Sequence, residues 1–489
     1  MRFDRLAAII LSLAFIFGLG FRLSDISSKT MLSHDEGISY LAATGHQGIF
    51  KEICLRGDYP VGQWVAASEW KRFLRPDKFF CFKQIGRDLA RYDLHPPLYF
   101  WLLHVWVSVF GTHMWAGPVL NLLLTALIMI FLYGFARSVL SSRLESAVVV
   151  FLWALSPYVL TASTVARQYD LFALFSLLLC WQVIRVIRAP DEWPPRRFVL
   201  LFLTALAGAL TLYSFAMVVA GCAILTILTL GRRHTRRAAQ VLIGLSVGYA
   251  SFVVFHPKFM ESFELARLAI SQQAPGGVST KLATVATALS QFFVHQRAGG
   301  VILVVIAVLI VSSAVAVLYA GSKTQREGDK REVNAGNLVV FLFLWNLVGV
   351  AVPYIATMSM AHAMGARYLG AAWLLIGFVP VLFVRRFIPK WRVPLLVALC
   401  GWQLFYGGAF AAVTMSRTLH QRTPGQILNA ANAVLVDSVA RGVLPRVFWL
   451  LGDDKVMFAA SQVDMLRDPD TWVGHLPGGS LYVSHIGYG

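Results

Sequence analysis

The succession of long apolar stretches is the feature that most constrains how this chain can fold. A bilayer offers the backbone no hydrogen-bond partners, so a stretch of about 17 to 25 apolar residues crosses it as a helix. Hydrophobic residues make up 57% of the chain and charged residues 14%, which excludes an ordinary soluble domain. We therefore predict an all-α polytopic membrane protein with about eleven transmembrane helices, at residues 6–23, 115–136, 144–161, 170–187, 198–214, 216–231, 238–255, 299–320, 338–356, 369–384 and 393–412.

The distribution of basic residues predicts the topology. The formal net charge of +18 would suggest nucleic acid in a soluble chain, but here arginine and lysine cluster in the short loops 137–143, 185–197, 232–237, 323–331 and 385–392. Such loops stay on the cytoplasmic side of a membrane, so we expect a cytoplasmic N-terminus and no nucleic-acid partner. The apolar stretch 97–110 is short for a span, and it is predicted to be an interfacial helix.

This topology predicts two domains. Residues 1–414 would form the transmembrane domain, whose first outer loop covers residues 24–114 and contains interfacial helices. Residues 415–489 turn polar and would form a small outer α/β domain, with a helix at 424–441 and strands at 446–451 and 480–485. Cys54 and Cys81 share the first outer loop, and whether they form a disulfide stays open, because spacing does not test geometry.

Asp35 and Glu36 directly follow the first apolar stretch. Acids next to lipid need a wet cavity or a cationic partner. One interpretation is a polar flank that ends the first span; the other is a general base or a metal ligand at an outer-face active site, with His34 beside it. Glycosyl transfer requires a carboxylate that accepts the acceptor's proton, and one acid of the pair could do this while its neighbour orients a partner.

Further candidate residues lie at the entrance of the predicted interfacial helix and at outer ends of predicted spans. His95 precedes two prolines that suit the first turn of a helix, so it is either a helix cap or a residue of the same cavity as Asp35. Arg167 is either a snorkelling anchor or a fixed cation for a phosphate group. Outer-side aromatic and basic residues accompany them: Tyr99, Tyr169, Tyr368, Arg367, Lys258 and Arg297.

Taken in order, these motifs resemble those of the GT-C membrane glycosyltransferases over roughly residues 1–390. The closest branch looks like the bacterial relatives of protein O-mannosyltransferases, which include aminoarabinose and galacturonic acid transferases that modify lipid A. The resemblance implies a polyprenyl-phosphate-linked sugar donor, transfer on the periplasmic face of the bacterial inner membrane, and inversion at the anomeric carbon. It implies that Asp35 is the base and Glu36 its partner, with Arg167 and Arg367 lining the cavity.

Two departures from the family pattern concern the loops. A Thr-His-Tyr-like turn is frequent in the family, whereas residues 211–214 here are Thr-Leu-Tyr-Ser. The first loop is also longer than expected between the acid pair and His95.

The predicted function is that of an integral membrane glycosyltransferase that moves a sugar from a polyprenyl-phosphate donor to a lipid or glycan acceptor, a lipid A-type molecule being one candidate. Donor phosphate binding is assigned to Arg167, Arg367, Lys258 and Arg297, and the cavity to His34, His95, Tyr99, Tyr169 and Tyr368. We expect a monomer surrounded by membrane lipids, without metal or cofactor. The alternatives are a transporter or flippase for a lipid-linked anion, which needs similar charges, and a glycan ligase or polymerase.

Overall fold

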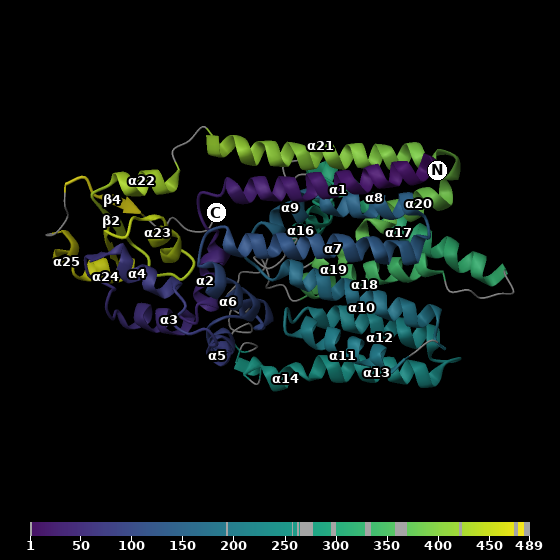
Figure 1. Cartoon of the computed structure of the whole chain (residues 1–489), viewed down its shortest axis with the longest axis horizontal. Coiled ribbons are helices and arrows are strands. Elements are labelled where there is room, and N and C mark those ends of the chain that lie inside the picture. The colour runs from purple at the N-terminus through teal and green to yellow at the C-terminus, as the bar shows by residue number, and fades with distance from the viewer. Residues whose placement is uncertain are drawn as a thin grey trace.

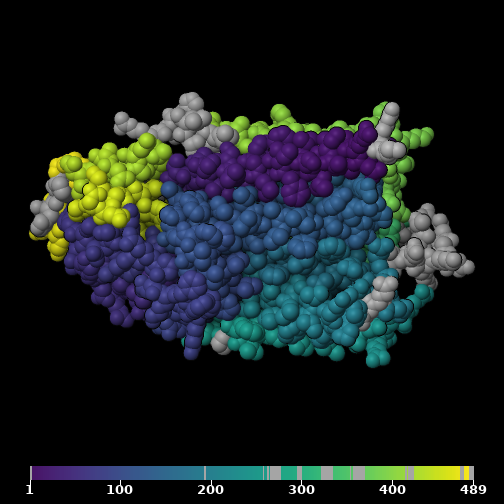
Figure 2. Space-filling model, viewed as in Figure 1, coloured from purple at the N-terminus to yellow at the C-terminus, as the bar shows by residue number. Residues whose placement is uncertain are grey.

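The computed structural model is a long helical bundle with a smaller mixed region at one end (Figure 1). It describes residues 2–191, 194–256, 258–261, 264, 277–294, 300–327, 334–356, 369–419, 423–473 and 478–483. We call the end with the first loop and the C-terminal segment the domain end, and the end where the first helix begins the far end. The space-filling view shows the first loop and the C-terminal segment in contact at the domain end (Figure 2).

Within these ranges, eight helices are long and apolar enough to cross a membrane: Phe3–Ser27, Ala116–Leu140, Tyr169–Arg188, Thr235–Phe255, Gly300–Ala320, Ala335–Val352, Gly370–Phe387 and Pro389–Val413. The pair α8 (Arg143–Ala154) and α9 (Pro157–Ser163), bent by 60°, makes a ninth candidate. The polytopic all-α prediction is confirmed, but the count of eleven is not. The predicted spans 198–214 and 216–231 correspond to α11 (Pro195–Ala209) and α12 (Phe215–Leu230), which have only 15 and 16 residues.

The other elements of the bundle have the following bounds: α1 (Arg2–Ser27), α7 (Ala116–Leu140), α10 (Tyr169–Arg188), α13 (Thr235–Ala250), α14 (Phe252–Phe255), α16 (Val278–Ser290), α17 (Gly300–Glu327), α18 (Ala335–Ala356), α19 (Gly370–Ile376), α20 (Phe378–Phe387), η3 (Pro389–Trp391) and α21 (Arg392–Leu419). Helix α1 packs along α8, and α10 lies between α7, α11 and α12.

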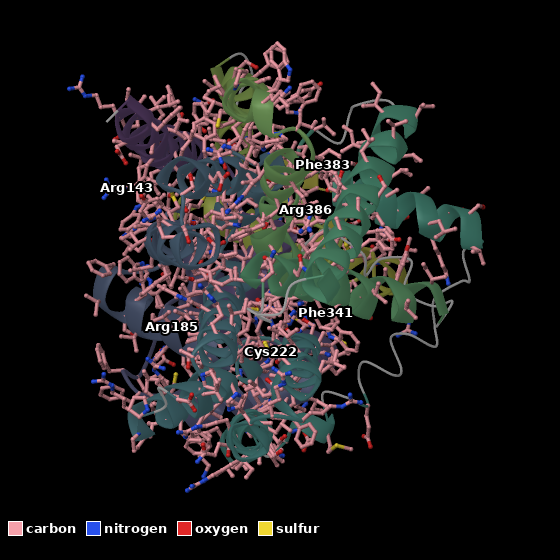
Figure 3. The ribbon with its side chains drawn as sticks, turned by 90° about the vertical axis from the view of Figure 1, so that its right-hand side faces the viewer. Arg143, Arg185, Cys222, Phe341, Phe383 and Arg386 are labelled. Carbon is pink, nitrogen blue, oxygen red and sulfur yellow. The ribbon has the colours of Figure 1, made fainter. Side chains whose placement is uncertain are left out.

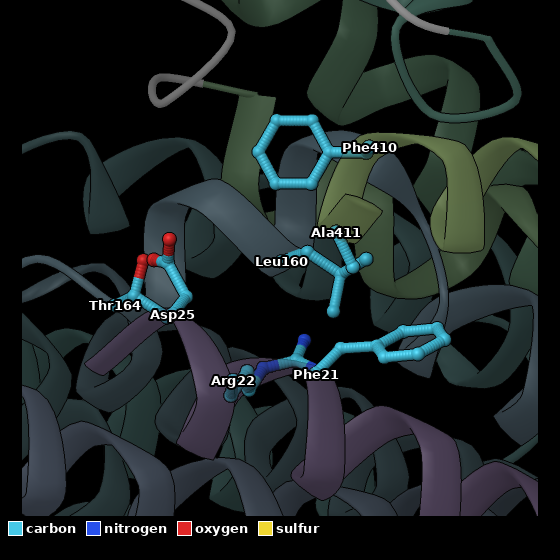
Figure 4. A pocket seen from close by; sticks show the side chains of 7 residues that line it. All are labelled: Phe21, Arg22, Asp25, Leu160, Thr164, Phe410 and Ala411. Atoms are coloured by element: carbon cyan, nitrogen blue, oxygen red, sulfur yellow. The ribbon is translucent and has the colours of Figure 1, made fainter. Parts of the chain in front are cut away.

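A buried arginine fixes α1 at the bend between α8 and α9. The bend leaves the last carbonyl groups of α8 without helical donors, and buried polar groups of this kind need a partner. Arg22 of α1 is fully buried and donates to the carbonyl oxygen of Ala154 at 2.8 Å and to that of Gly18 at 2.6 Å. Its guanidinium borders a small hollow between α1, α9 and α21 (Figure 4). The residues that follow α1 are thereby held close to the chain after α9.

The first loop folds into a set of short helices: α2 (His34–Ala43), α3 (Gln47–Arg56), α4 (Ala67–Lys71), η1 (Arg72–Leu74), α5 (Phe82–Tyr92) and α6 (Leu98–Phe110), together with strand β1 (Val65–Ala66). Helix α6 confirms the helix predicted at 97–110. Trp70 stacks on Phe448 of the C-terminal segment with ring centroids 6.1 Å apart, so the loop and the segment share a core. Cys54 and Cys81 are both free thiols, which answers the open question of a disulfide.

The C-terminal segment contains α22 (Pro424–Ala430), β2 (Ala433–Val436), α23 (Leu444–Leu450), β3 (Val456–Ala459), α24 (Gln462–Arg467), α25 (Asp470–Val473) and β4 (Leu481–Val483). The sheet order is β1-β3-β2-β4, with β2 parallel to β3 and β4, and β1 of the first loop antiparallel to β3. The strand predicted at 480–485 is confirmed by β4.

Two secondary-structure predictions in this segment are wrong. The predicted helix 424–441 ends at Ala430 and is followed by β2, whose four residues are all buried. The predicted strand 446–451 is helix α23, which packs on α4 and α2. Short apolar runs fit a buried strand and a buried helix equally well, and tertiary packing decides between them. The division of the chain at residues 414 and 415 stays a prediction.

Candidate active site

The site is built around the start of α2. Ser33 caps this helix: its hydroxyl accepts the N–H of Glu36 at 3.4 Å, and the Glu36 carboxylate accepts the N–H of Ser33 at 2.8 Å. This reciprocal arrangement is a capping box, and it explains why a helix begins here. Glu36 is fully buried, pairs with Lys29 Nζ at 2.6 Å and accepts the N–H of Ala166 at 3.0 Å. Its contacts therefore join the end of α1, the start of α2 and the chain between α9 and α10.

Asp35 lies next to Arg167. The Asp35 side chain is 29% exposed, whereas the Arg167 side chain is only 4% exposed. Arg167 Nε is 3.9 Å from Asp35 Oδ2, and Arg167 Nη1 donates to Ser39 Oγ at 3.3 Å. Asn121 of α7 fixes the backbone around Arg167 by donating to the carbonyl oxygens of Val165 and Arg167 at 2.6 and 3.0 Å. The arginine is thus rigidly placed, and Asp35 is the acid of the pair that solvent can reach.

His95 connects Arg167 to a second acid, Asp93. Arg167 Nη2 is 3.0 Å from His95 Nε2, and His95 Nδ1 is 2.7 Å from Asp93 Oδ1. Burial and the Arg167 guanidinium lower the pKa of His95 below its ordinary value of 6.5, although Asp93 acts in the opposite direction. A guanidinium only donates hydrogen bonds. Neutral His95 therefore has its proton on Nδ1, donates to Asp93 and accepts from Arg167.

Asp93 is ionised in spite of its burial. Burial disfavours its charged form, but hydrogen bonding from His95 and the charges of Arg441 and Arg167 hold the pKa of Asp93 well below its usual range. Gln47 Nε2 also donates to Asp93 Oδ2, at 3.0 Å. Sequence reasoning missed Asp93; its place two residues before His95 is the signal that could have indicated it.

Two arginines of the C-terminal segment complete the site. Arg441 Nη1 lies 3.6 Å from Asp93 Oδ2 and donates to the carbonyl oxygen of Tyr92. Arg446 Nε donates to the carbonyl oxygen of Leu32 at 2.9 Å. His34 packs directly on the backbone between them, because a Cβ added at Gly442 would be 1.7 Å from His34 Cε1. No sequence pattern pointed to Arg441, because its role depends on packing between distant segments.

The remaining predicted residues fall in three groups. Tyr99 is fully buried and its hydroxyl has no hydrogen-bond partner among the described residues; Tyr169 raises the pKa of Arg167 in spite of the opposing effect of burial. Lys258 is exposed and pairs with Glu261 at 2.9 Å, and no described contact joins it to Asp35. Predictions for Arg297, Arg367 and Tyr368 lie outside the described residues. Independence from metals and cofactors stays a prediction.

An apolar groove runs along the bundle surface. It measures about 1200 Å³, and side chains of α16, α17 and α18 line it, among them Leu282, Leu289, Val308 and Leu347. Leu282 and Val308 are more than half exposed, so the groove opens toward the surface that lipid would cover.

One buried cation adjoins this groove. Lys281 precedes the lining residue Leu282, is 3% exposed and donates to the carbonyl oxygen of Ile355 in the last turn of α18 at 3.3 Å. Helix α18 runs from the far end toward the domain end (Figure 1). A lysine at a helix C-terminus is stabilised by the helix dipole, and no acidic side chain within the described ranges pairs with it. In the segment 256–297, sequence reasoning named Lys258 but missed Lys281.

Comparison with known structures identifies the fold. The crystal structure of ArnT from Cupriavidus metallidurans bound to undecaprenyl phosphate superposes with a TM-score of 0.53 at 12% identity, covering 95% of this chain and 87% of that chain. The apo structure of the same protein gives a TM-score of 0.50 at 12% identity, covering 95% and 88%. The chain is therefore a membrane protein with the GT-C glycosyltransferase fold, as its motifs predicted.

A family model matches part of the chain. Residues 94–260, about a third of the chain, match the family described as dolichyl-phosphate-mannose-protein mannosyltransferase. The matched region contains His95 and Arg167 and extends from just before α6 to residue 260, just after α14. A comparison with curated protein sequences finds no match.

Proposed function

We propose that this protein is a membrane glycosyltransferase that moves a sugar from a polyprenyl-phosphate-linked donor to a lipid or glycan acceptor, with inversion at the anomeric carbon. Transfer would take place at the domain end, which would face the periplasm of a bacterial inner membrane. The observation that most supports this is the pairing of a solvent-accessible acid, Asp35, with a buried arginine that is itself oriented by His95.

Asp35 is the best candidate for the general base. Glu36 is engaged by Lys29 and by two backbone N–H groups, and Asp93 by His95 and Arg441, so both have lost their freedom to accept a proton from a substrate. Asp35 retains exposed surface and faces a fixed cation. A base of this kind accepts the proton of the acceptor hydroxyl as the anomeric bond breaks.

The donor would bind between Arg167 and the apolar groove. A departing polyprenyl phosphate gains negative charge, and prearranged cations stabilise that charge without reorganisation. Arg167 supplies one such cation, and Lys281 at the groove edge supplies another in place of Lys258. The groove of α16, α17 and α18 offers apolar surface to an isoprenoid chain. The structural relative ArnT is bound to undecaprenyl phosphate, which supports this class of donor.

The test is transfer by purified protein in detergent. The assay measures release of undecaprenyl phosphate from undecaprenyl-phosphate-linked pentose, hexose and uronic acid donors in the presence of cell-envelope lipids. Asp35→Asn should lower the rate by about 10² to 10⁴ if proton transfer is limiting. Asp58→Asn is the matched control, because Asp58 is an exposed acid of the same loop with no hydrogen bond or ion pair of its side chain among the described residues. Full activity of Asp35→Asn would remove Asp35 as the base.

The same assay separates the enzyme from a transporter. Detergent solution has no compartments, so a flippase yields no product there, whereas a transferase does. Absence of turnover with every donor class would contradict the proposed function.

A further inference from the structure

A hollow at the far end of the bundle has the chemistry of an anion site. It measures about 650 Å³ and lies where the end of α7, the end of α10 and the start of α11 meet. Its lining residues are Ser138, Ile184, Arg185, Arg188, Ala189 and Arg197. Three of these are arginines, and none of the lining residues in the described part of the chain is acidic.

The three arginines that line the hollow come from two helices. Arg185 and Arg188 are three residues apart on α10, so their side chains lie on the same face of that helix. Arg197 comes from the next helix. Arg188 donates to the carbonyl oxygen of Ser138, which ties it to the end of α7. The Arg185 side chain is exposed, and its guanidinium has no hydrogen bond or ion pair with any described residue. Two adjacent like charges repel, and an anion between them would relieve the repulsion.

Three other arginines at the far end have acidic partners among the described residues. Arg143 pairs with Asp4 at 3.2 Å, and Arg385 and Arg392 each lie 3.4 Å from the buried Glu145. Figure 3 looks onto this end and shows Arg143, Arg185 and Arg386 on the same side of the molecule. In the hollow, by contrast, Arg185 and Arg188 of α10 form no ion pair with an acid of the described residues.

The hollow lies beside closely packed apolar residues of α7 and α10 and next to an exposed apolar face of α11. Gly134 of α7 admits the indole of Trp181, since a Cβ at Gly134 would be 2.7 Å from Trp181 Cη2. Gly134 lies one helical turn before the lining residue Ser138, and Trp181 lies one turn before the lining residue Arg185. On α11, Val199, Leu200 and Leu203 are at least half exposed and follow Arg197. A phosphate in the hollow could thus belong to a lipid whose chains cover α11.

We propose that this hollow binds the phosphate group of an anionic phospholipid in the leaflet opposite the candidate active site. Arginine forms paired hydrogen bonds with phosphate oxygens, which suits a site with three guanidinium groups. Basic pockets between membrane helices bind lipid headgroups in this way. The bound lipid would hold α7, α10 and α11 together.

The test measures binding to the full-length protein in neutral detergent and does not depend on transfer activity. Dioctanoyl phosphatidylglycerol is titrated at fixed ionic strength, and the rise of the unfolding temperature gives an apparent dissociation constant. Dioctanoyl phosphatidylcholine and inorganic phosphate are titrated in parallel. We expect saturable stabilisation by phosphatidylglycerol alone. Arg185→Gln and Arg188→Gln should each weaken binding about fivefold, and the double variant about 30-fold.

Arg143→Gln is the control, because Arg143 is an exposed arginine of the same end outside the hollow. It should bind phosphatidylglycerol like the wild type. Equal weakening in this control would indicate diffuse surface attraction and overturn the site. Equal stabilisation by inorganic phosphate would show a site for the free ion, and equal stabilisation by phosphatidylcholine would show that charge is irrelevant; either result rejects the proposal. Arg185 has no described partner to lose, so the single Arg185→Gln variant tests the site even if the double variant does not fold.

Discussion

Replacing Arg167 by lysine and by glutamine separates its charge from its geometry. Lysine retains a positive charge near Asp35, but its single ammonium group cannot also reproduce the hydrogen bonds to His95 and Ser39, which are 3.0 and 3.3 Å long. Glutamine loses both the charge and the fork of donors. Because Arg167 is buried and held in place, no neighbouring side chain can move in to replace the contacts that either variant loses.

The magnitudes follow from the distances. Two unit charges 3.9 Å apart attract by about 4 kcal/mol at an effective dielectric constant of 20. Asp35 is 29% exposed, and solvent screening reduces this to about 2 kcal/mol. A hydrogen bond from a charged donor contributes about 1.5 kcal/mol more. We therefore expect kcat/KM to fall about 10-fold in Arg167→Lys and about 400-fold in Arg167→Gln.

The assay is release of undecaprenyl phosphate by the purified protein, with Arg143→Gln as a control for the loss of an arginine far from the site. Unfolding temperatures measured in the same detergent separate lost chemistry from lost structure. Equal rates for Arg167→Lys and the wild type would refute the role of the several hydrogen bonds that the guanidinium donates. Equal losses in the lysine and glutamine variants would refute the role of the charge.

Three other predictions concern single residues. The folded-state pKa of His95 lies below 6.5, so the contribution of neutral His95 to the free energy of unfolding is complete above pH 6.5 and is lost as the pH falls through the folded-state pKa. In the same pH range kcat/KM should fall as the pH is lowered, and His95→Gln should make this decrease smaller. Glu36→Gln should lower the free energy of unfolding by about 3 kcal/mol, because it leaves the Lys29 charge without its partner; thermal unfolding in detergent measures this, and an unchanged midpoint would contradict it. Lys281→Gln should raise the KM for the lipid-linked donor about 10-fold, whereas Lys258→Gln should change this KM by about twofold or less. Steady-state kinetics measure both values. A larger increase in KM for Lys258→Gln than for Lys281→Gln would show that Lys258 is the cation that binds the donor phosphate.

The sequence predicts the membrane helices well because one physical rule governs them. Lipid forces each spanning segment to satisfy its own backbone, so a long apolar run has one structural solution. The rule weakens for shorter helices: α11 and α12 share the run 198–231 and each falls short of a full span. It does not apply to β2 and α23, whose short apolar sequences fit either kind of element until tertiary contacts select one.

Local sequence signals located part of the site. Asp35 and Arg167 were selected by position at the end of a predicted span and His95 by position at the start of the predicted interfacial helix. The structure brings the three together. The Ser33 to Glu36 spacing is a capping-box pattern, and it could have assigned Glu36 to helix initiation from sequence alone. Arg441 could not have been found in this way, because it reaches the site only through the packing of α23 against α2 and α4.

Asp93 explains why the C-terminal segment belongs to the site. A buried carboxylate is costly unless its partners surround it, and Asp93 draws them from three parts of the chain. His95 lies in the same loop, Arg167 acts through His95 from the segment between α9 and α10, and Arg441 comes from the C-terminal segment. Removing any one of them leaves a charge less well compensated, so the position of Arg167 beside Asp35 depends on the docking of a segment that is distant in sequence. The first loop and the C-terminal segment therefore do more than cover the bundle, because their charged residues fix the electrostatics around the candidate base.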